Sequence, residues 1–384
     1  MHWDVIIVGL GGVGSAAAYH VARTGQRVLG IDQYPPVHAY GSSHGKTRII
    51  RQAYFEHPDY VPLLRRAYVL WDELSELIGE QLFQRTGLVE LGPAAGVVIP
   101  GVLRSAHEHD LDVEKLTSAE VARRWPQLAT PDDLQAVFEH NAGYLRVESC
   151  VAAHLRLARQ AGATLLHDTP CVEWRTDGAG VIVSTPHESY RASRLIVAAG
   201  AWSTQLLHDI GVPLQVVRKH QYWYQPTSSG FSQQDRFPCF FHETPAGFFY
   251  GFPAMDDMGV KVARHSGGTA IDAPAPQRRF AGCEPTARLH PPDAQDRTLV
   301  EAFTAEYLPM LGHQLRHQAG CYYTLTPDEH FVVALHPQHA QVVVVAGLSG
   351  HGFKFTSVLG ELACQLAING HTTLNTELFS IRCR

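Results

Sequence analysis

The chain has 384 residues, of which 45% are hydrophobic and 18% are charged, so it can bury a large core and exceeds the size at which single cores usually stop growing. Its formal net charge of -6, with Lys and Arg scattered, argues against nucleic acid as a partner, and no apolar run approaches the roughly 20 residues of a membrane helix. A first strand beginning at residue 3 leaves no room for a signal peptide, so we expect a cytoplasmic protein of two domains.

Cysteines are spread along the chain without a CxxC pair. The seven are Cys150, Cys171, Cys239, Cys283, Cys321, Cys364 and Cys383. An odd number of distant cysteines indicates neither a disulfide framework nor a zinc site, and we expect no bound metal.

The first 32 residues follow the pattern of a dinucleotide-binding unit. Apolar and helical patterns alternate, with a strand at 5–8, a helix at 16–23 and a strand at 28–31. Gly9, Gly11 and Gly14 form G-x-G-x-x-G between the first strand and the helix, and Asp32 ends the second strand. These glycines permit a tight turn, close approach to a pyrophosphate and helix packing, while the acidic residue reaches the ribose. The unit predicts dinucleotide binding but does not distinguish NAD from FAD.

The segment 41–51 places Arg48 and Arg51 three positions apart behind a flexible loop. If a helix or tight turn carries them, both guanidinium groups point to one side, where one suits an amino-acid carboxylate and the other a flavin ring. A solvated basic turn is the alternative. The following residues, 59–77, carry apolar side chains at spacings of three and four, the last at Leu77, which predicts a helix with one face in the core.

The middle of the chain changes from short apolar strands to an aromatic-rich region. The short strands are expected at 181–183 and 194–199. Between about 214 and 261, Phe, Tyr and Trp are frequent and strand-like alternation predicts a large antiparallel sheet. A period of two places Lys261 and His265 on one face, where they could share a site, although a solvated strand face fits equally. The Pro-rich segment 273–292 is typical of a surface excursion.

The C-terminal region predicts a strand at 342–346, a glycine-rich turn and a helix at 356–369. Amides at Gly350 and Gly352 could donate to the negative edge of a reduced flavin, and Lys354 could be a second cation for a carboxylate. The alternative for Lys354 is a surface residue that lies over apolar neighbours.

Taken together, motifs from residue 3 to the last residues resemble the family of monomeric sarcosine oxidases and N-methyltryptophan oxidases, within the amine oxidases similar to D-amino acid oxidase. These motifs are the opening fingerprint, Ser43-His44-Gly45-x-Thr47-Arg48-x-x-Arg51, Tyr250-Gly251-Phe252-Pro253, Cys321-x-Tyr323-Thr324, Pro327-Asp328-Glu329-His330-Phe331 and Gly350-His351-Gly352-Phe353-Lys354-Phe355.

The resemblance implies a cofactor and the residues that hold it. The cofactor is FAD, joined through its 8α carbon to Cys321. The other residues expected against it are Gly9, Gly11, Gly14, Asp32, His44, Thr47, Arg48, Gly200, Gly350, Gly352 and Lys354. An ordinary buried thiol is the alternative for Cys321.

The resemblance also implies a substrate site. Arg51 and Lys354 would bind the substrate carboxylate, with Tyr250 and Phe241 beside them. The residues expected to act in catalysis are Lys261, where oxygen is activated, Arg48 beside the flavin ring, and His265, Tyr250 and Tyr323 around the amine. The chain departs from the family at Ala334, where relatives carry an acidic residue, and at Phe241, where a methionine lines the sarcosine pocket. The first departure puts a flavin-domain contact in doubt, and the second puts the substrate's size in doubt.

These inferences predict an α/β plus α+β flavoenzyme. A Rossmann-like FAD domain would comprise 1–80, 145–215 and 320–384, and a catalytic domain built on a large antiparallel sheet would comprise 81–144 and 216–319. Sarcosine, O2 and water would give glycine, formaldehyde and H2O2. Alternatives are an oxidase of N-methyl-L-tryptophan or of a cyclic imino acid such as pipecolate or proline, an NAD-dependent dehydrogenase, and a non-catalytic nucleotide-binding protein. The family implies a monomer whose partners are a small N-methyl or secondary amino acid and O2.

Overall fold

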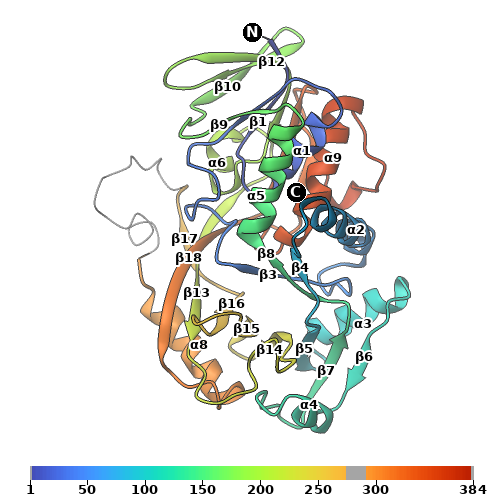
Figure 1. Cartoon of the computed structure of the whole chain (residues 1–384). Coiled ribbons are helices and arrows are strands. Elements are labelled where there is room, and N and C mark those ends of the chain that lie inside the picture. Colours follow the sequence, from blue (N-terminus) through green and yellow to red (C-terminus); the bar gives the residue numbers. More distant parts are fainter. Residues whose placement is uncertain (1, 274–290, 382–384) are drawn as a thin grey trace.

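The computed structural model describes residues 2–273 and 291–381. Two large sheets dominate this part of the chain and lie at opposite ends of the molecule, with the N-terminus beside the upper one (Figure 1). The core residues divide accordingly. One set of clusters lies around the upper sheet and its helices, and another lies under the aromatic strands of the lower sheet.

The upper sheet has eight strands within the described residues, drawn from both ends of the chain. In spatial order they are β10 (Glu173–Asp177), β11 (Gly180–Ser184), β12 (Ser189–Val197), β1 (His2–Val8), β2 (Val28–Ile31) and β9 (Thr164–Leu166), with β20 (Val342–Ala346) beside β12 and β19 (Val332–Leu335) beside β20. Strand β1 pairs in parallel with both β2 and β12. The carboxyl ends of these central strands therefore meet at one edge, where open α/β sheets bind their ligands.

Four long helices belong to this end of the molecule. They are α1 (Gly12–Ala22), α2 (Val61–Ile78), α5 (Val147–Gln160) and α9 (Thr356–Asn369). Helix α1 packs against both α5 and α9. The contact with α9 is close because Gly360 has no side chain, and a Cβ there would lie 2.5 Å from that of Ala16. The first and last helices of the chain thus share one core.

The lower sheet has nine strands in the described chain. They are β17 (Thr269–Ile271), β13 (Gln215–Tyr224), β16 (Val260–Arg264), β15 (Gly247–Phe252), β14 (Cys239–Thr244), β5 (Leu88–Pro93), β7 (Leu134–Glu139) and β6 (Glu114–Leu116), with β18 (Leu315–Leu325) paired with β13. Most pairs are antiparallel, and β14 with β5 is parallel. Helices α3 (Val98–Glu108), α4 (Ser118–Arg124) and α8 (Ala294–Tyr307) cover it, and the Phe303 ring of α8 stacks on Phe249 with ring centroids 4.4 Å apart.

A small third sheet carries the segment that contains the two arginines. Its strands are β3 (Thr47–Ile50), β8 (Gly143–Arg146) and β4 (Phe83–Gln84). The remaining regular elements are α6 (Ser203–Leu206) and the short helices η1 (Pro58–Tyr60), η2 (Gly200–Trp202), η3 (Phe353–Phe355) and η4 (Glu377–Phe379).

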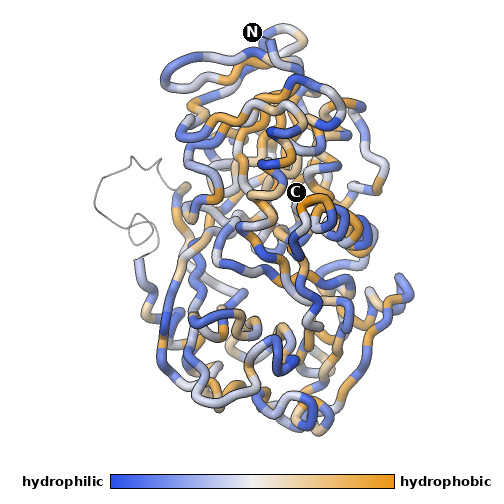
Figure 2. Tube along the Cα trace, in the orientation of Figure 1, coloured by the Kyte–Doolittle hydropathy of each residue, from blue (hydrophilic) through white to orange (hydrophobic). Residues whose placement is uncertain are grey.

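Hydrophobic residues concentrate along the inner strands and the facing sides of helices, whereas the outer loops are hydrophilic (Figure 2). No helix among residues 2–273 and 291–381 combines the length and apolar character that crossing a membrane requires.

The predicted fold class is confirmed, with differences at several boundaries. Helix α1 starts at Gly12 rather than 16, because part of the glycine-rich turn is itself helical. Strand β12 spans 189–197 rather than 194–199. Leu77 is wrong as a core residue, since it is 62% exposed at the last turn of α2. The proposed domain boundary at 320 falls inside β18, and most of the Pro-rich segment 273–292 lies outside the described residues.

Candidate active site

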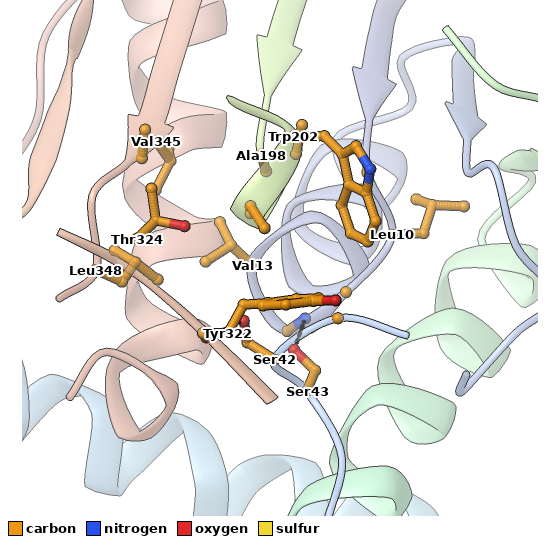
Figure 3. A pocket seen from close by; sticks show the side chains of 18 of the residues that line it. Leu10, Val13, Ser42, Ser43, Ala198, Trp202, Tyr322, Thr324, Val345 and Leu348 are labelled. Atoms are coloured by element: carbon orange, nitrogen blue, oxygen red, sulfur yellow. Dashed lines mark hydrogen bonds between the residues drawn. The ribbon is translucent and has the colours of Figure 1, made fainter. Parts of the chain in front are cut away.

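A large cavity lies at the carboxyl ends of β1, β2 and β12. It encloses about 1480 Å³ of empty space, part of it open to solvent, and is called here the first cavity. Eight of the predicted site residues line it: Gly9, Gly11, Asp32, Arg48, Gly200, Tyr323, Gly350 and Gly352. Figure 3 shows Trp202 and Leu10 on one side, Val345 and Leu348 on the other, and the Tyr322 ring across from Trp202.

The glycine turn packs as a dinucleotide fingerprint requires. A Cβ on Gly14 would lie 1.7 Å from the carbonyl oxygen of Gly9, so the third glycine is what lets α1 follow the turn directly. The Asp32 carboxylate accepts hydrogen bonds from the backbone N–H groups of Leu10 (2.7 Å) and Tyr34 (2.9 Å), which ties the turn to the end of β2. The Gly12 N–H donates to Ser43 Oγ at 3.0 Å (Figure 3). This arrangement fits a dinucleotide whose pyrophosphate lies at the N-terminus of α1.

We expect Gly14→Ala to abolish flavin binding, because the added methyl group meets a backbone oxygen that cannot move without breaking the turn. Overpacking typically costs about 1–3 kcal/mol, and more where backbone must shift, as it must here. The flavin-to-protein absorbance ratio of the purified variant measures the effect. Gly25→Ala is the control: its φ of +83° makes this change cost about 1 kcal/mol or more of stability, but a Cβ there meets no atom within 4 Å and Gly25 does not line the cavity, so flavin binding should be kept. A flavin-replete Gly14→Ala protein would contradict this role for the turn.

A second cavity adjoins the first, and the two share Arg48, Tyr323, Gly350 and Phe353. This second cavity is lined by the other predicted substrate residues, namely Arg51, Phe241, Tyr250, His265 and Lys354, together with Ile49, Glu56 and His351. Cations and aromatic rings therefore surround a small space next to the first cavity.

The two arginines reach this second cavity by a different local structure from the one predicted. We expected a helix or tight turn, but Arg48 lies in β3 and Arg51 lies one residue beyond its end at Ile50. Residues three apart on a continuous strand point to opposite faces, and the end of β3 removes that constraint. The Arg48 guanidinium donates to the carbonyls of Ser42 (2.7 Å) and Thr47 (2.8 Å).

Arg51 is buried against two carboxylates and three aromatic rings. Its Nη2 donates to Glu56 Oε2 at 2.7 Å, and its Nε lies 3.2 Å from Glu90 Oε1. The guanidinium carbon lies over the rings of Tyr54, Phe55 and Phe241, at 4.5, 4.6 and 5.7 Å from their centroids. Burial opposes the charge of Arg51, but Glu56 and Glu90 raise its pKa above the ordinary value. Arg51 is therefore a permanent buried cation.

Lys354 and Glu90 titrate near neutral pH in this environment. Burial, reinforced by the charge of Arg51, lowers the pKa of Lys354 to about 7, and its Nζ donates to the carbonyl of His351 at 2.8 Å and to Tyr54 Oη at 3.3 Å. Burial raises the pKa of Glu90 to about 8 against the opposing effect of Arg51. The net charge around Arg51 therefore changes between about pH 7 and about pH 8.

Glu56 and Glu90 escaped the sequence analysis. Glu90 lies among the apolar residues of β5, where a lone acidic residue in a buried strand signals a charge that needs a partner. Glu56 follows Arg51 by five positions, a spacing that carries no pattern of its own, and only the folded chain brings the two side chains together.

Lys261 and His265 contact different parts of the site. Strand β16 ends at Arg264, and His265 Nδ1 lies 3.3 Å from Tyr323 Oη. The buried Lys261 Nζ donates to the carbonyls of Gly45 (2.8 Å) and Thr47 (3.0 Å), and burial, followed by the charge of Arg48, lowers its pKa well below the ordinary value. Lys261 lines neither cavity. It holds the loop that leads into Arg48.

Several predicted cofactor residues also lie behind the cavity walls. Gly14, His44, Thr47 and Cys321 are buried without lining either cavity, while the neighbours of Cys321, Tyr322 and Tyr323, line the first. Cys321 is 2% exposed, and its Sγ accepts a hydrogen bond from Gln221 Nε2 at 3.2 Å. Its attachment to a flavin stays a prediction.

One cluster elsewhere has the chemistry of a metal site. Atoms of Asp209, His336 and His339 lie within 4.8 Å of one another. Both ring nitrogens of His336 already have partners, Nε2 at 3.2 Å from Asp209 Oδ1 and Nδ1 accepting from the Gln338 N–H at 3.2 Å. Protein groups therefore engage both ring nitrogens of His336.

Comparisons with known proteins identify the family. Residues 4–366 match the model of the FAD dependent oxidoreductase family. The chain is 39% identical to monomeric sarcosine oxidase of Bacillus sp. (strain B-0618), covering 99% of this chain and 96% of that protein. It is 41% identical to N-methyl-L-tryptophan oxidase of Salmonella agona (strain SL483), covering 96% and 95%. The solved structure of NikD, an amino acid oxidase essential for nikkomycin biosynthesis, is 23% identical and shares the fold, with a TM-score of 0.83 over 99% of this chain and 97% of that one.

The family match chooses FAD over NAD, which the glycine fingerprint alone left open. The resemblance predicted from the motifs is confirmed. The chain belongs to the FAD-dependent oxidoreductases, and within them it is a flavin-dependent amine oxidase.

Proposed function

We propose that the enzyme oxidises the N-methyl C–N bond of a small N-methyl amino acid, with sarcosine as substrate, and that its FAD is attached to Cys321. The observation that carries this proposal is the pair of buried cations, Arg51 and Lys354, in an aromatic cavity that adjoins the first cavity. When bound, FAD supplies the hydride acceptor, and O2 reoxidises it to give H2O2. The oxidised substrate is then hydrolysed to glycine and formaldehyde.

Arg51 and Lys354 bind the substrate carboxylate in this proposal. A guanidinium can grip a carboxylate with two parallel hydrogen bonds, and a second cation fixes the orientation. Arg51 already pairs with Glu56, which also lines the cavity, so the substrate carboxylate competes with Glu56 for Nη2. The two cations direct the N-methyl carbon toward the side of the cavity shared with the flavin site, at Arg48 and Tyr323.

The aromatic wall excludes water from the reacting bond. Tyr250, His265 and Tyr323 line the second cavity, and burial lowers the pKa of His265 to about 3, so the imidazole is neutral at working pH. A dry, cationic cavity favours the neutral form of the substrate amine, the form that can donate a hydride. Arg48 places positive charge where negative charge develops as oxygen is reduced, and Lys261 holds the loop 45–47 that leads into Arg48.

Phe241 supports a small substrate over a large one. Its ring lies 5.2 Å from Phe55 and 5.8 Å from His265, measured between centroids, and so occupies one side of the cavity. The 41% identity to an N-methyl-L-tryptophan oxidase keeps a larger N-methyl amino acid as the second candidate.

The visible spectrum under anaerobic conditions tests the proposal. Bleaching of the oxidised flavin band by sarcosine, with formaldehyde formed after air is admitted, would support it. Bleaching by N-methyl-L-tryptophan alone would establish the second candidate, and a flavin that neither amine reduces would overturn both. Flavin that stays with acid-precipitated protein would separately establish covalent attachment, and Cys321→Ser should release it.

Carboxylate binding should weaken as the pH rises through about 7. Lys354 is charged below this pH and loses its charge above it. Glu90 gains a negative charge around pH 8. Both changes make the binding of an anion less favourable. Titration with methoxyacetate, which has a carboxylate but no amine to ionise, isolates the effect. Lys354→Met should bind weakly at low pH and lose most of the pH dependence, and the exposed Lys115→Met should behave as wild type. Tighter binding at high pH would contradict the assignment.

A further inference from the structure

The buried side-chain amide of Gln221 donates a hydrogen bond to the thiol of Cys321, while its amide oxygen has no partner among the described residues. Gln221 on β13 is fully buried, and its Nε2 donates to Cys321 Sγ at 3.2 Å. Its Oε1 is buried without a hydrogen-bond partner among the described residues. Buried amides normally have both ends satisfied, so this half-satisfied side chain calls for an explanation other than fold stability.

The surroundings keep the Gln221 amide in place. Gly45 has a φ of +88°, and a Cβ there would lie 2.4 Å from Gln221 Oε1. Glycine therefore leaves the space that the amide occupies. The Gly45 carbonyl accepts from Lys261, and its N–H donates to Glu148 at 2.7 Å, which fixes the loop on the other side. The amide is thus confined between this loop and Cys321.

The sheet register brings a cation to the same sulfur. Strands β13 and β18 pair Lys219 with Cys321, and opposite residues of an antiparallel pair project from the same face. Lys219 is 2% exposed and its Nζ donates to the carbonyls of Ser266 (2.7 Å) and Gly267 (3.0 Å). A thiol that must ionise gains from an N–H donor and a nearby cation, whereas an inert buried thiol needs neither.

Other buried cysteines lack this arrangement. Cys239 is fully buried and has a hydroxyl partner, Thr86, at 3.4 Å, and burial raises its thiol pKa to about 12. Cys150 is fully buried, and burial raises its thiol pKa well above the ordinary value. Neither thiol is bonded by a side-chain amide in the described structure, and neither lies in β18, whose residues Tyr322 and Tyr323 line the first cavity.

We propose that Gln221 is the positioning residue for attachment of FAD to Cys321: its amide N–H orients the sulfur and stabilises the thiolate that forms the bond. The inference rests on the covalent attachment included in the proposed function. Overall, the S–H of Cys321 and one C–H of the flavin 8α methyl group are lost and an S–C bond forms. The two electrons and two protons released pass to O2, which becomes H2O2, so the co-reactant is the oxygen that the oxidase already uses.

The test follows the rate of attachment after FAD is added in air to full-length protein produced under riboflavin limitation. Covalent flavin is read as fluorescence of the denatured chain on a gel and as its mass, and total flavin as the amount retained on a native column. We expect Gln221→Met to bind FAD but to attach it about tenfold or more slowly near neutral pH, because the thiolate loses the N–H that donates to it. Gln84→Met, the same change at a buried glutamine of β4, should attach at the wild-type rate.

Two further readouts separate positioning from a structural role. Raising the pH should restore the rate of Gln221→Met, because alkaline pH forms the thiolate even without the amide. The titratable groups that face Cys321 are the same in the variant and in the wild type. These groups are Lys219, Lys261, Tyr250, Tyr322 and Tyr323. The midpoint of thermal unfolding should stay the same or rise, because the variant buries no unpartnered oxygen.

Attachment by Gln221→Met at the wild-type rate would overturn the inference. If Gln221→Met does not retain FAD, the same comparison with Gln221→Leu decides, since this branched side chain has a different shape from methionine but also offers the sulfur no hydrogen. Loss of total flavin in both variants would assign Gln221 to FAD binding and overturn its role in attachment. A wild-type protein that releases all its flavin in acid would overturn attachment itself, while its reduction by sarcosine would still support the oxidase activity.

Discussion

Replacing Arg51 with methionine is expected to lower kcat/KM for sarcosine by roughly 10² to 10⁴. The variant cannot pair with the substrate carboxylate, and the loss of one partner of a buried charge pair costs about 3–5 kcal/mol. The guanidinium is 3% exposed and bonded to Glu56, and Lys354, whose pKa is about 7, is a single ammonium that cannot replace its two-pronged grip on a carboxylate. Steady-state kinetics measure the loss, and the flavin content of the variant shows whether the fold survives.

A matched substrate isolates the role of the carboxylate. Dimethylamine has the same N-methyl carbon but no carboxylate, and its kcat/KM should be low and similar in wild type and Arg51→Met. Arg85→Met is the control variant, since Arg85 also lies over a phenylalanine ring and pairs with an acidic residue, Asp72, but is 37% exposed. Surface pairs contribute about 0–1 kcal/mol, so this change should have little effect. An Arg51→Met enzyme with sarcosine kinetics close to wild type would place the carboxylate elsewhere.

The fold was predictable where local patterns are strong. Three elements lie within a few residues of their predicted bounds, namely the glycine turn, β2 and α9. Their hydrophobic residues recur with a regular period, and glycines mark where the chain turns. The pairing of distant strands is not encoded locally. Strand β14 lies beside β5, about 150 positions earlier in the sequence, and only the complete sheet shows this contact.

The candidate site was predictable in composition but not in contacts. Motif resemblance identified Arg51 and Lys354, and both line the second cavity. Their pKa values depend on Glu56 and Glu90, which come from other positions in the folded chain and match no motif. Gln221 was missed for the same reason, since a glutamine between aromatic residues in a strand has no pattern that points to a distant cysteine.

The protein should lose stability steeply as the pH falls from about 6.5 toward 5. Four buried histidines have pKa values lowered by burial, His20 to about 4 and His154, His242 and His265 to about 3. Each stays neutral in the folded chain but takes up a proton after unfolding, near its ordinary pKa. Stability from such groups is complete above the unfolded pKa and is lost as the pH falls toward the folded value.

Glu90 acts in the opposite sense, because its raised pKa leaves it protonated in the folded chain and ionised after unfolding. Burial also raises the pKa values of Glu139 and Asp296, which act as Glu90 does, and lowers that of His351 well below its ordinary value. Five histidines against three carboxyls leave an uptake of about two protons on unfolding, so the free energy of unfolding falls by about 3 kcal/mol per pH unit. Since domains have total stabilities of about 5–15 kcal/mol, a slope of this size removes a large share of the stability within about two pH units. Urea denaturation of the holoenzyme at several pH values measures this slope.

His242 offers the sharpest test of this acid sensitivity. Burial alone lowers its pKa, its Nε2 has no hydrogen-bond partner among the described residues, and its ring packs edge-on against Phe303 and Tyr307. His242→Phe removes the titrating group without breaking a hydrogen bond at that nitrogen. It should reduce proton uptake on unfolding by about one and raise stability most at low pH. Phe249→Leu, a packing change in the same cluster, should lower stability equally at every pH. If the two variants share the same pH slope, the buried histidines are not the source of the acid sensitivity.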